Sequence, residues 1–167
     1  KDGICKLSKL SENGKDQIVK LVVKGDLLGQ RSLVNGETAN LSSVALNDME
    51  VCFIPKNEII ELFKNNSEFS FEITKSLAED LDEANSAIAN MAQKNVRERL
   101  AESLLFFERI FGIDTNGYIA VTLTREEIAN AIGTATESTI RLLSEFKKEA
   151  YISLSGKKIR IENKVKL

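Results

Sequence analysis

The strongest constraint on the fold is a helical pattern interrupted by a glycine, in the stretch TREEIANAIGTATESTIRLLSEFKKE (residues 124–149). Thr124 and Glu127 have the spacing of a capping box, which starts a helix. Gly133 suits the left-handed conformation that ends a helix sharply, so that a second helix can leave at a steep angle. The expected buried residues are Ile128, Ala131 and Ile132 in the first helix and Ile140, Leu143 and Phe146 in the second.

The start of the second helix is polar, and we expect it to face outward. Ala135 cannot cap this helix, so Thr134 or Thr136 is the expected cap. A Gly-centred hairpin follows in LSGKKIRI (residues 154–161), with Lys157, Lys158 and Arg160. Two helices joined by a tight turn, followed by a basic hairpin, indicate a winged helix-turn-helix.

The pair Glu137 and Arg141 has two interpretations. Residues four apart on a helix commonly form a surface ion pair that contributes about 0.3–0.5 kcal/mol. At the start of a helix that reads DNA, Arg can donate to guanine and Glu can accept from cytosine, and Glu can also hold the Arg side chain. The tight turn and the basic hairpin favour DNA, although a module that binds protein stays open. The expected DNA-binding residues are Thr124, Thr136, Glu137, Ser138, Arg141, Lys157 and Lys158.

Composition excludes several kinds of chemistry for these 167 residues. They include no histidine, so the catalytic pairs and zinc sites that need one are excluded. No glycine-rich phosphate loop is present either. We therefore expect no enzyme, no metal and no cofactor, and we interpret Cys5 and Cys52 as buried thiols. No apolar run approaches the roughly 18 residues that cross a membrane, which favours a cytoplasmic protein.

Charge is distributed unevenly along the chain. Residues 1–95 contain 11 Lys and Arg against 15 Asp and Glu, whereas residues 134–167 contain 8 against 4. An acidic first part and a basic end suggest a nucleic-acid contact at the C-terminal end. A solvated basic tail explains the charge alone equally well.

The first part of the chain has the pattern of short antiparallel strands. The stretches ICKLSKL and QIVKLVV flank Asn13-Gly14, a strong hairpin signal. Further strands are expected in GDLLGQ (residues 25–30), LSSVAL (residues 41–46) and EVCFIP (residues 50–55). Short strands at this spacing indicate a small barrel or roll, which Pro55 closes before a short helix in NEIIELFKNN.

A long helix follows, capped by Asn66 or Ser67. Its apolar and small residues form a heptad seam, consisting of Leu77, Leu81, Ala84, Ile88 and Met91. A strip this narrow favours pairing with an identical helix over packing on its own domain. The pattern then shifts near Lys94–Asn95 to Val96, Leu100, Leu104, Phe107 and Phe111, which implies a hinge and a second unit. The prediction is an α+β fold with a partial β-roll (1–65), a dimerisation helix and hinge (66–95) and a winged helix-turn-helix (96–167).

The residues resemble the Crp/Fnr transcription regulators. The stretch LTREEIANAIGTATESTIRLLSEFKKEAYISLSGKKIRIEN looks like their winged helix-turn-helix, and GDLLGQRSLVNGETANLSSVAL looks like their cyclic-nucleotide-binding β-roll. LAEDLDEANSAIANM is similar to their dimerisation helix. The resemblance implies a homodimer that regulates transcription at a palindromic operator in double-stranded DNA, with RNA polymerase as a further partner. It also implies that the first part of the β-roll lies before Lys1.

Two departures from the family pattern affect function. The family's second helix usually begins Ser/Thr-Arg-Glu-Thr-x-x-Arg, and here Thr136 replaces the first Arg, which puts the operator sequence in doubt. Members that respond to cyclic AMP have Gly-Glu and Arg-Ser in the effector pocket, where this chain has Gly29-Gln30 and Ala39-Asn40. Arg31 is one position further and, on a strand, would face another way. We expect no response to cyclic AMP. The alternative is a cyclic-nucleotide sensor that uses Gln30 and Arg31 in a non-standard way.

Overall fold

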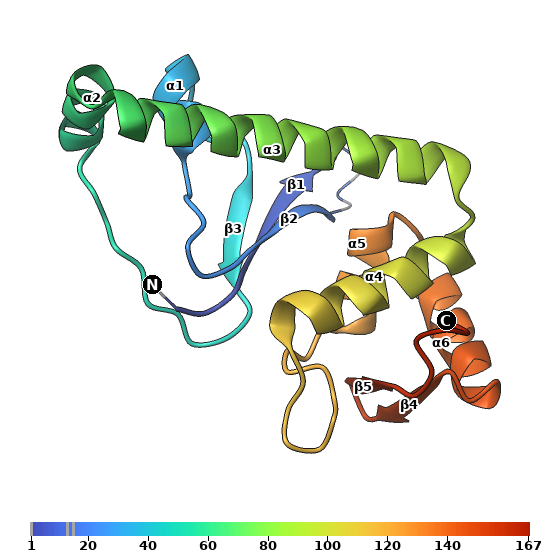
Figure 1. Cartoon of the computed structure of the whole chain (residues 1–167). Coiled ribbons are helices and arrows are strands. Elements are labelled where there is room, and N and C mark those ends of the chain that lie inside the picture. The colour runs from blue at the N-terminus through green and yellow to red at the C-terminus, as the bar shows by residue number, and fades with distance from the viewer. Residues whose placement is uncertain (1, 13, 15) are drawn as a thin grey trace.

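The computed structural model describes residues 2–12, 14 and 16–167 (Figure 1). Its strands are β1 (Cys5–Leu10), β2 (Asp16–Val22), β3 (Ser42–Ala45), β4 (Ile152–Ser155) and β5 (Lys158–Ile161). Its helices are α1 (Gln30–Asn35), α2 (Lys56–Asn65), α3 (Ser67–Gln93), α4 (Val96–Phe111), α5 (Arg125–Ile132) and α6 (Thr136–Lys148). Within the described ranges, no helix is both long and apolar enough to span a membrane.

The N-terminal half contains a three-stranded antiparallel sheet in the order β2-β1-β3. Cys5 lies in the middle of it, opposite Val22 on one side and Ala45 on the other. The predicted hairpin between the first two strands is confirmed. Gly14 has φ of 77°, as the turn requires, while Asn13 lies outside the described residues. Cys5 is buried, as predicted, whereas the prediction for Cys52 is wrong because its side chain is exposed.

Two of the predicted strands are wrong. In residues 25–30, Gly25 and Gly29 both have positive φ, and the chain turns there into α1 instead of extending. Arg31 therefore lies on a helix and not on a strand. In residues 50–55, a single bridge joins Glu50 to Asp2, and the rest of that segment pairs with no described strand. An apolar run becomes a strand only where a neighbour supplies hydrogen bonds.

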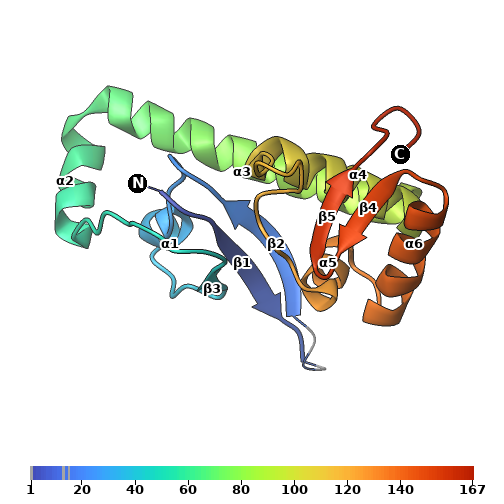
Figure 2. The same ribbon diagram turned by 90° about the horizontal axis from the view of Figure 1, so that it is seen from below.

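The long helix α3 begins and ends where the sequence predicts. The Asn66 side chain accepts a hydrogen bond from the Phe69 N–H at 3.0 Å and caps the helix. α3 ends at Gln93, and Asn95 starts α4 with a full capping box. Figures 1 and 2 show α3 running along both halves of the molecule, with the sheet below one part and α4 to α6 at the other end.

The C-terminal half has its own hydrophobic core, built from α4, α5, α6 and the β4–β5 hairpin. The predicted burial of Ile140 is wrong, since its side chain is 48% exposed. Thr139 and Leu142 are buried instead. They share one helix face with Leu143 and Phe146, and Ile140 lies about 100° around the helix from Thr139. In α5, Ala129 is buried where the sequence favoured Ala131.

Candidate nucleic-acid interface

The turn between α5 and α6 has the predicted shape. The Thr124 hydroxyl accepts from the Glu127 N–H at 3.1 Å, and the Glu127 carboxylate accepts from the Thr124 N–H at 2.8 Å. Gly133 is left-handed, with φ of 66° and ψ of 50°. The predicted capping of α6 by Thr134 or Thr136 is wrong, because Ala135 is the N-cap and no side chain caps the helix. The first N–H groups of α6 are thus left to other partners.

The first turns of α6 carry four of the predicted DNA-binding residues. Glu137 is exposed, and the Arg141 side chain is 66% exposed. Thr136 and Ser138 are half-buried in the first turn. Figures 1 and 2 both place α6 at the outer edge of the C-terminal half, away from the three-stranded sheet. A long duplex could therefore approach this face without meeting the sheet.

Arg141 has a different partner from the predicted one. Its guanidinium donates to Glu145 at 2.8 Å, so the expected pair with Glu137 is not formed. Glu145 also accepts from Arg97 of α4 at 3.4 Å, and Arg97 donates to Glu149 at 2.5 Å. The Arg141 side chain is thereby drawn toward the C-terminal end of α6, and Glu137 keeps its acceptor oxygens free of ion pairs in the described chain.

The wing is the hairpin formed by β4 and β5. Lys158 donates to Asp114 at 2.8 Å, and this hydrogen bond holds the pKa of that carboxyl below its ordinary value. Lys157 is exposed at the turn, and its ammonium makes no hydrogen bond or ion pair with the residues that the structure describes. Of the two predicted wing lysines, Lys157 is therefore the one available to an outside anion.

Arg125 connects the wing to the first turn of α5. Its guanidinium donates to the carbonyl oxygens of Gly156 at 3.0 Å and of Lys157 at 3.2 Å. Burial lowers the pKa of Arg125. The sequence does not predict this contact, because the position of Arg125 next to a predicted cap gives no sign of a partner 31 residues away.

Arg99 of α4 connects the end of α3 with the helix-turn-helix. It donates to the carbonyl oxygens of Lys94 at 2.8 Å and of Ile132 at 2.9 Å. One side chain at the start of α4 thus links the end of α3 to the turn. The sequence does not predict this role of Arg99 either, because Glu98 beside it and its place in the first turn of a helix give no sign of backbone acceptors in other elements.

Only part of the predicted effector segment, at Gly29 and Gln30, contacts other elements of the fold. Gly29 is the N-cap of α1, with φ of 92°, and the Gln30 amide donates to Asp80 of α3 at 3.1 Å. Asp80 also pairs with Lys20 of β2. Burial favours the neutral amine of Lys20, but the hydrogen bond and charge of Asp80 outweigh it, and the pKa of Lys20 is raised. Three elements are thus joined at Asp80.

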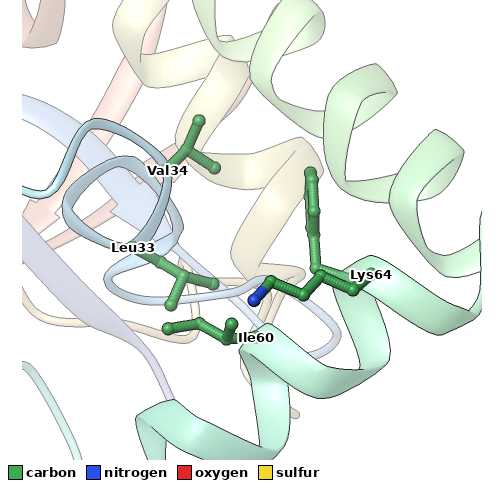
Figure 3. A pocket seen from close by; sticks show the side chains of 5 residues that line it. Leu33, Val34, Ile60 and Lys64 are labelled. Atoms are coloured by element: carbon green, nitrogen blue, oxygen red, sulfur yellow. The ribbon is translucent and has the colours of Figure 1, made fainter.

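The remaining residues of that segment lie apart from this contact. Ala39 and Asn40 are in the exposed loop before β3, and no hydrogen bond among the described residues joins them to Gln30. A nearby cavity of about 160 Å³ lies between α1 and α2 (Figure 3) and contains none of the predicted pocket residues. It is lined by Leu33, Val34, Ile60, Phe63 and Lys64.

The seam predicted on α3 faces solvent in the single chain. Leu81 is 61% exposed, Ile88 67% and Met91 45%. Ala84 is also exposed, and Leu77 is half-buried near the sheet end of the helix. Large apolar side chains in one row on a helix usually have a partner.

Two family models match two separate parts of this chain, in the order of its structural elements. The cyclic nucleotide-binding domain matches residues 1–66, and the Crp-like helix-turn-helix domain matches residues 98–167. The chain belongs to the Crp/Fnr family of transcription regulators. Both the α+β architecture and the resemblance inferred from the sequence are therefore confirmed.

Individual Crp/Fnr relatives align with nearly the whole chain. A CRP-like cAMP-activated global transcriptional regulator of Mycobacterium tuberculosis is 24% identical over 99% of this chain and 75% of the relative. A global nitrogen regulator of Nostoc sp. is 28% identical over 99% of this chain and 76% of the relative. The solved structure of FixK2 from Bradyrhizobium japonicum has the same fold, with a TM-score of 0.85 and 23% identity, covering 99% of this chain and 81% of that one.

Proposed function

We propose that this chain acts as a homodimeric, sequence-specific DNA-binding regulator of transcription that does not respond to cyclic AMP. We further propose that its three segments have separate roles. Residues 1–65 are the effector part, residues 66–95 the dimerisation helix and hinge, and residues 96–167 the DNA-binding domain. The family membership supports the general function, and the residue roles follow from the interface described above.

The observation that carries the proposal is the exposure of Glu137 and Arg141 on α6, together with a wing lysine, Lys157, whose ammonium has no partner among the described residues. Arg141 can donate two hydrogen bonds to a guanine, and Glu137 can accept from a cytosine amino group. Thr136, Ser138 and the uncapped N–H groups of α6 suit phosphate oxygens. Lys157 adds a positive charge at the turn of the wing. The Thr124 hydroxyl is occupied in capping α5, so its contribution is to position the turn.

The exposed seam of α3 supports the homodimer. Leu81 and Ile88 lie one heptad apart, as residues that meet their symmetry mates along a two-fold axis do. Pairing of two such helices sets two copies of α6 side by side, and the half-sites of the operator are then about one helical turn, ~34 Å, apart. A palindromic operator follows from this symmetry.

The contacts of Gln30 support a regulator that does not bind cyclic AMP. A cyclic phosphate in a buried pocket needs a charge-assisted donor, and Ala39 and Asn40 supply none. The amide of Gln30 is already bonded to Asp80. The relatives named above differ in their signals, one being cAMP-activated and another a nitrogen regulator, so membership alone does not decide the effector.

The proposal is tested by selecting bound duplexes from a random DNA pool with the full chain. The expected result is a palindrome with half-sites about one helical turn apart. Sedimentation of the protein without DNA measures the dimer independently. Enrichment of a single asymmetric site, or of no site, would contradict the proposed DNA recognition. Weak DNA binding that does not change with salt would favour a module that binds protein.

A further inference from the structure

The tip of the wing has little support of its own. Ile152 and Ile161, which pair at its base, are buried in the C-terminal core, whereas Ser155, Gly156 and Lys157 at its tip are exposed. An isolated two-stranded hairpin is marginally stable in water. Gly156 has φ of 59° and holds the position that a type II′ turn reserves for glycine. The direction of the tip therefore depends on contacts from outside the hairpin.

Arg125 supplies such a contact at a specific place. The two oxygens that it binds belong to the peptide groups immediately before and after the Cα of Lys157. Because each peptide group is planar, holding both oxygens restricts the two backbone dihedral angles of Lys157. The guanidinium presents its N–H groups in a rigid fork, which suits two neighbouring acceptors.

The surroundings of Arg125 exclude an ordinary ion pair. The side chain is half-buried, and no carboxylate of the described chain lies within ion-pair distance of it. Partial burial of a charge without a counter-charge costs free energy, and the two carbonyl oxygens are the acceptors that compensate for it. What the guanidinium holds in place is the backbone that carries Lys157, the wing lysine whose ammonium is unpaired in the part of the chain that the structure describes.

We propose that Arg125 is a positioning residue for DNA binding: it holds the wing turn so that the ammonium of Lys157 reaches the phosphate backbone. This inference rests on the proposed function. It differs from a direct contact between Arg125 and phosphate, because an Arg125 that acts through Lys157 loses its effect on DNA binding once Lys157 is removed.

A double-mutant cycle separates the two roles. Arg125→Ala, Lys157→Ala and the double variant of the full chain are titrated into a labelled duplex of about 30 base pairs, roughly three helical turns, at several salt concentrations. One phosphate contact corresponds to about eightfold in affinity at 0.1 M salt and a salt slope of about 0.9. We expect each single variant to lose about that much and the double variant to lose no more. Arg109→Ala, which removes an α4 arginine stacked on Phe106, is the matched control for charge and should change the salt slope little.

The outcomes that overturn the proposal are distinct. Losses that multiply in the double variant, with a slope reduced by about two contacts, show that Arg125 itself binds phosphate. If Arg125→Ala binds the duplex with the same affinity and salt slope as the parent, the two hydrogen bonds from Arg125 to the wing contribute nothing to DNA binding. A parent protein without salt-dependent duplex binding overturns the proposed function, and this inference with it.

A second variant keeps the test valid if Arg125→Ala does not fold. Arg125→Lys retains the charge and favours the helix, but it lacks the fork that spans two carbonyls. We expect it to bind DNA as weakly as Lys157→Ala, and we expect faster amide hydrogen exchange at residues 155–158 in the absence of DNA. Full binding by Arg125→Lys would show that charge is sufficient and would overturn the positioning role.

Discussion

Lys6 of β1 and Glu127 of α5 form an ion pair of 2.8 Å, although they lie 121 positions apart in the chain. Their side chains are only 13% and 18% exposed. Close by, the Gln17 amide of β2 donates to the Asn130 carbonyl of α5 at 2.5 Å. The three-stranded sheet is thus docked directly on the first helix of the helix-turn-helix, and Glu127 serves both this contact and the capping box of α5.

Replacing Lys6 tests the strength of this docking. Lys6→Ala leaves the half-buried Glu127 carboxylate without its cation, and we expect a loss of about 1–2 kcal/mol in the free energy of unfolding. Urea titration measures it. Lys9→Ala, which removes an exposed lysine from the same strand, is the control. Equal stability of the two variants would show that the ion pair contributes nothing to the docking.

The same pair predicts a pH dependence. Burial of Glu127 opposes its ionised form, but the hydrogen bonds from Lys6 and Thr124 outweigh burial and hold the pKa below its ordinary value of about 4.5. The folded state then binds fewer protons than the unfolded state, so this stabilisation is present above about pH 5 and is lost as the pH falls through the folded pKa. We expect the parent to lose more stability than Lys6→Ala between about pH 5 and 3. If the free energy of unfolding fell equally with pH in the two proteins, this prediction would be contradicted.

The features that the sequence predicted correctly are local ones. The capping box at Thr124, the left-handed Gly133 and the limits of α3 each depend on residues within one or two turns, where residue type and backbone geometry are directly linked. Short-range patterns therefore located the helix-turn-helix and the long helix.

Several of the features that failed depend on distant neighbours. Residues 25–30 and 50–55 have the apolar character of strands, but a strand also needs a partner with free hydrogen-bonding groups. The burial of Thr139 in place of Ile140 follows from where α4 and α5 pack against α6. Arg99 and Arg125 donate to backbone carbonyl oxygens outside their own helices. Every residue has such a carbonyl, so residue type does not show which one will accept.

Arg141 should determine base preference at one position of each half-site. We expect Arg141→Ala to reduce affinity for the selected operator by about 1–3 kcal/mol and to relax the preference for one G·C pair. Affinity for an unrelated duplex should fall far less, because base contacts specify and phosphate contacts do not. Selection of duplexes with the variant measures this preference directly, and an unchanged preference would assign base reading to another residue.

Ile88 should lie at the centre of the dimer seam. Ile88→Asp places two unpaired charges in the paired helices, and the expected penalty to dimerisation is several kcal/mol. Sedimentation at a range of concentrations measures it, and circular dichroism checks that the chain remains folded. Ser86→Asp adds the same charge on the opposite face of α3 and should leave the dimer intact. If both variants stay as dimeric as the parent, the interface lies elsewhere.

The effector segment should not recognise cyclic AMP. Its neutral residues Ala39 and Asn40 offer no charged donor, and an anion removed from water without one is strongly disfavoured. Calorimetric titration of the full chain should therefore show no saturable binding at micromolar cyclic AMP. A micromolar Kd would correspond to a binding free energy of about −8 kcal/mol. The paired substitution Ala39→Arg with Asn40→Ser supplies the missing donors, and gain of binding in that variant would show that the rest of the segment is competent. Micromolar, stoichiometric binding by the parent would instead mean that Gln30 or Arg31 holds the ligand, and that the contact between Gln30 and Asp80 opens to admit it.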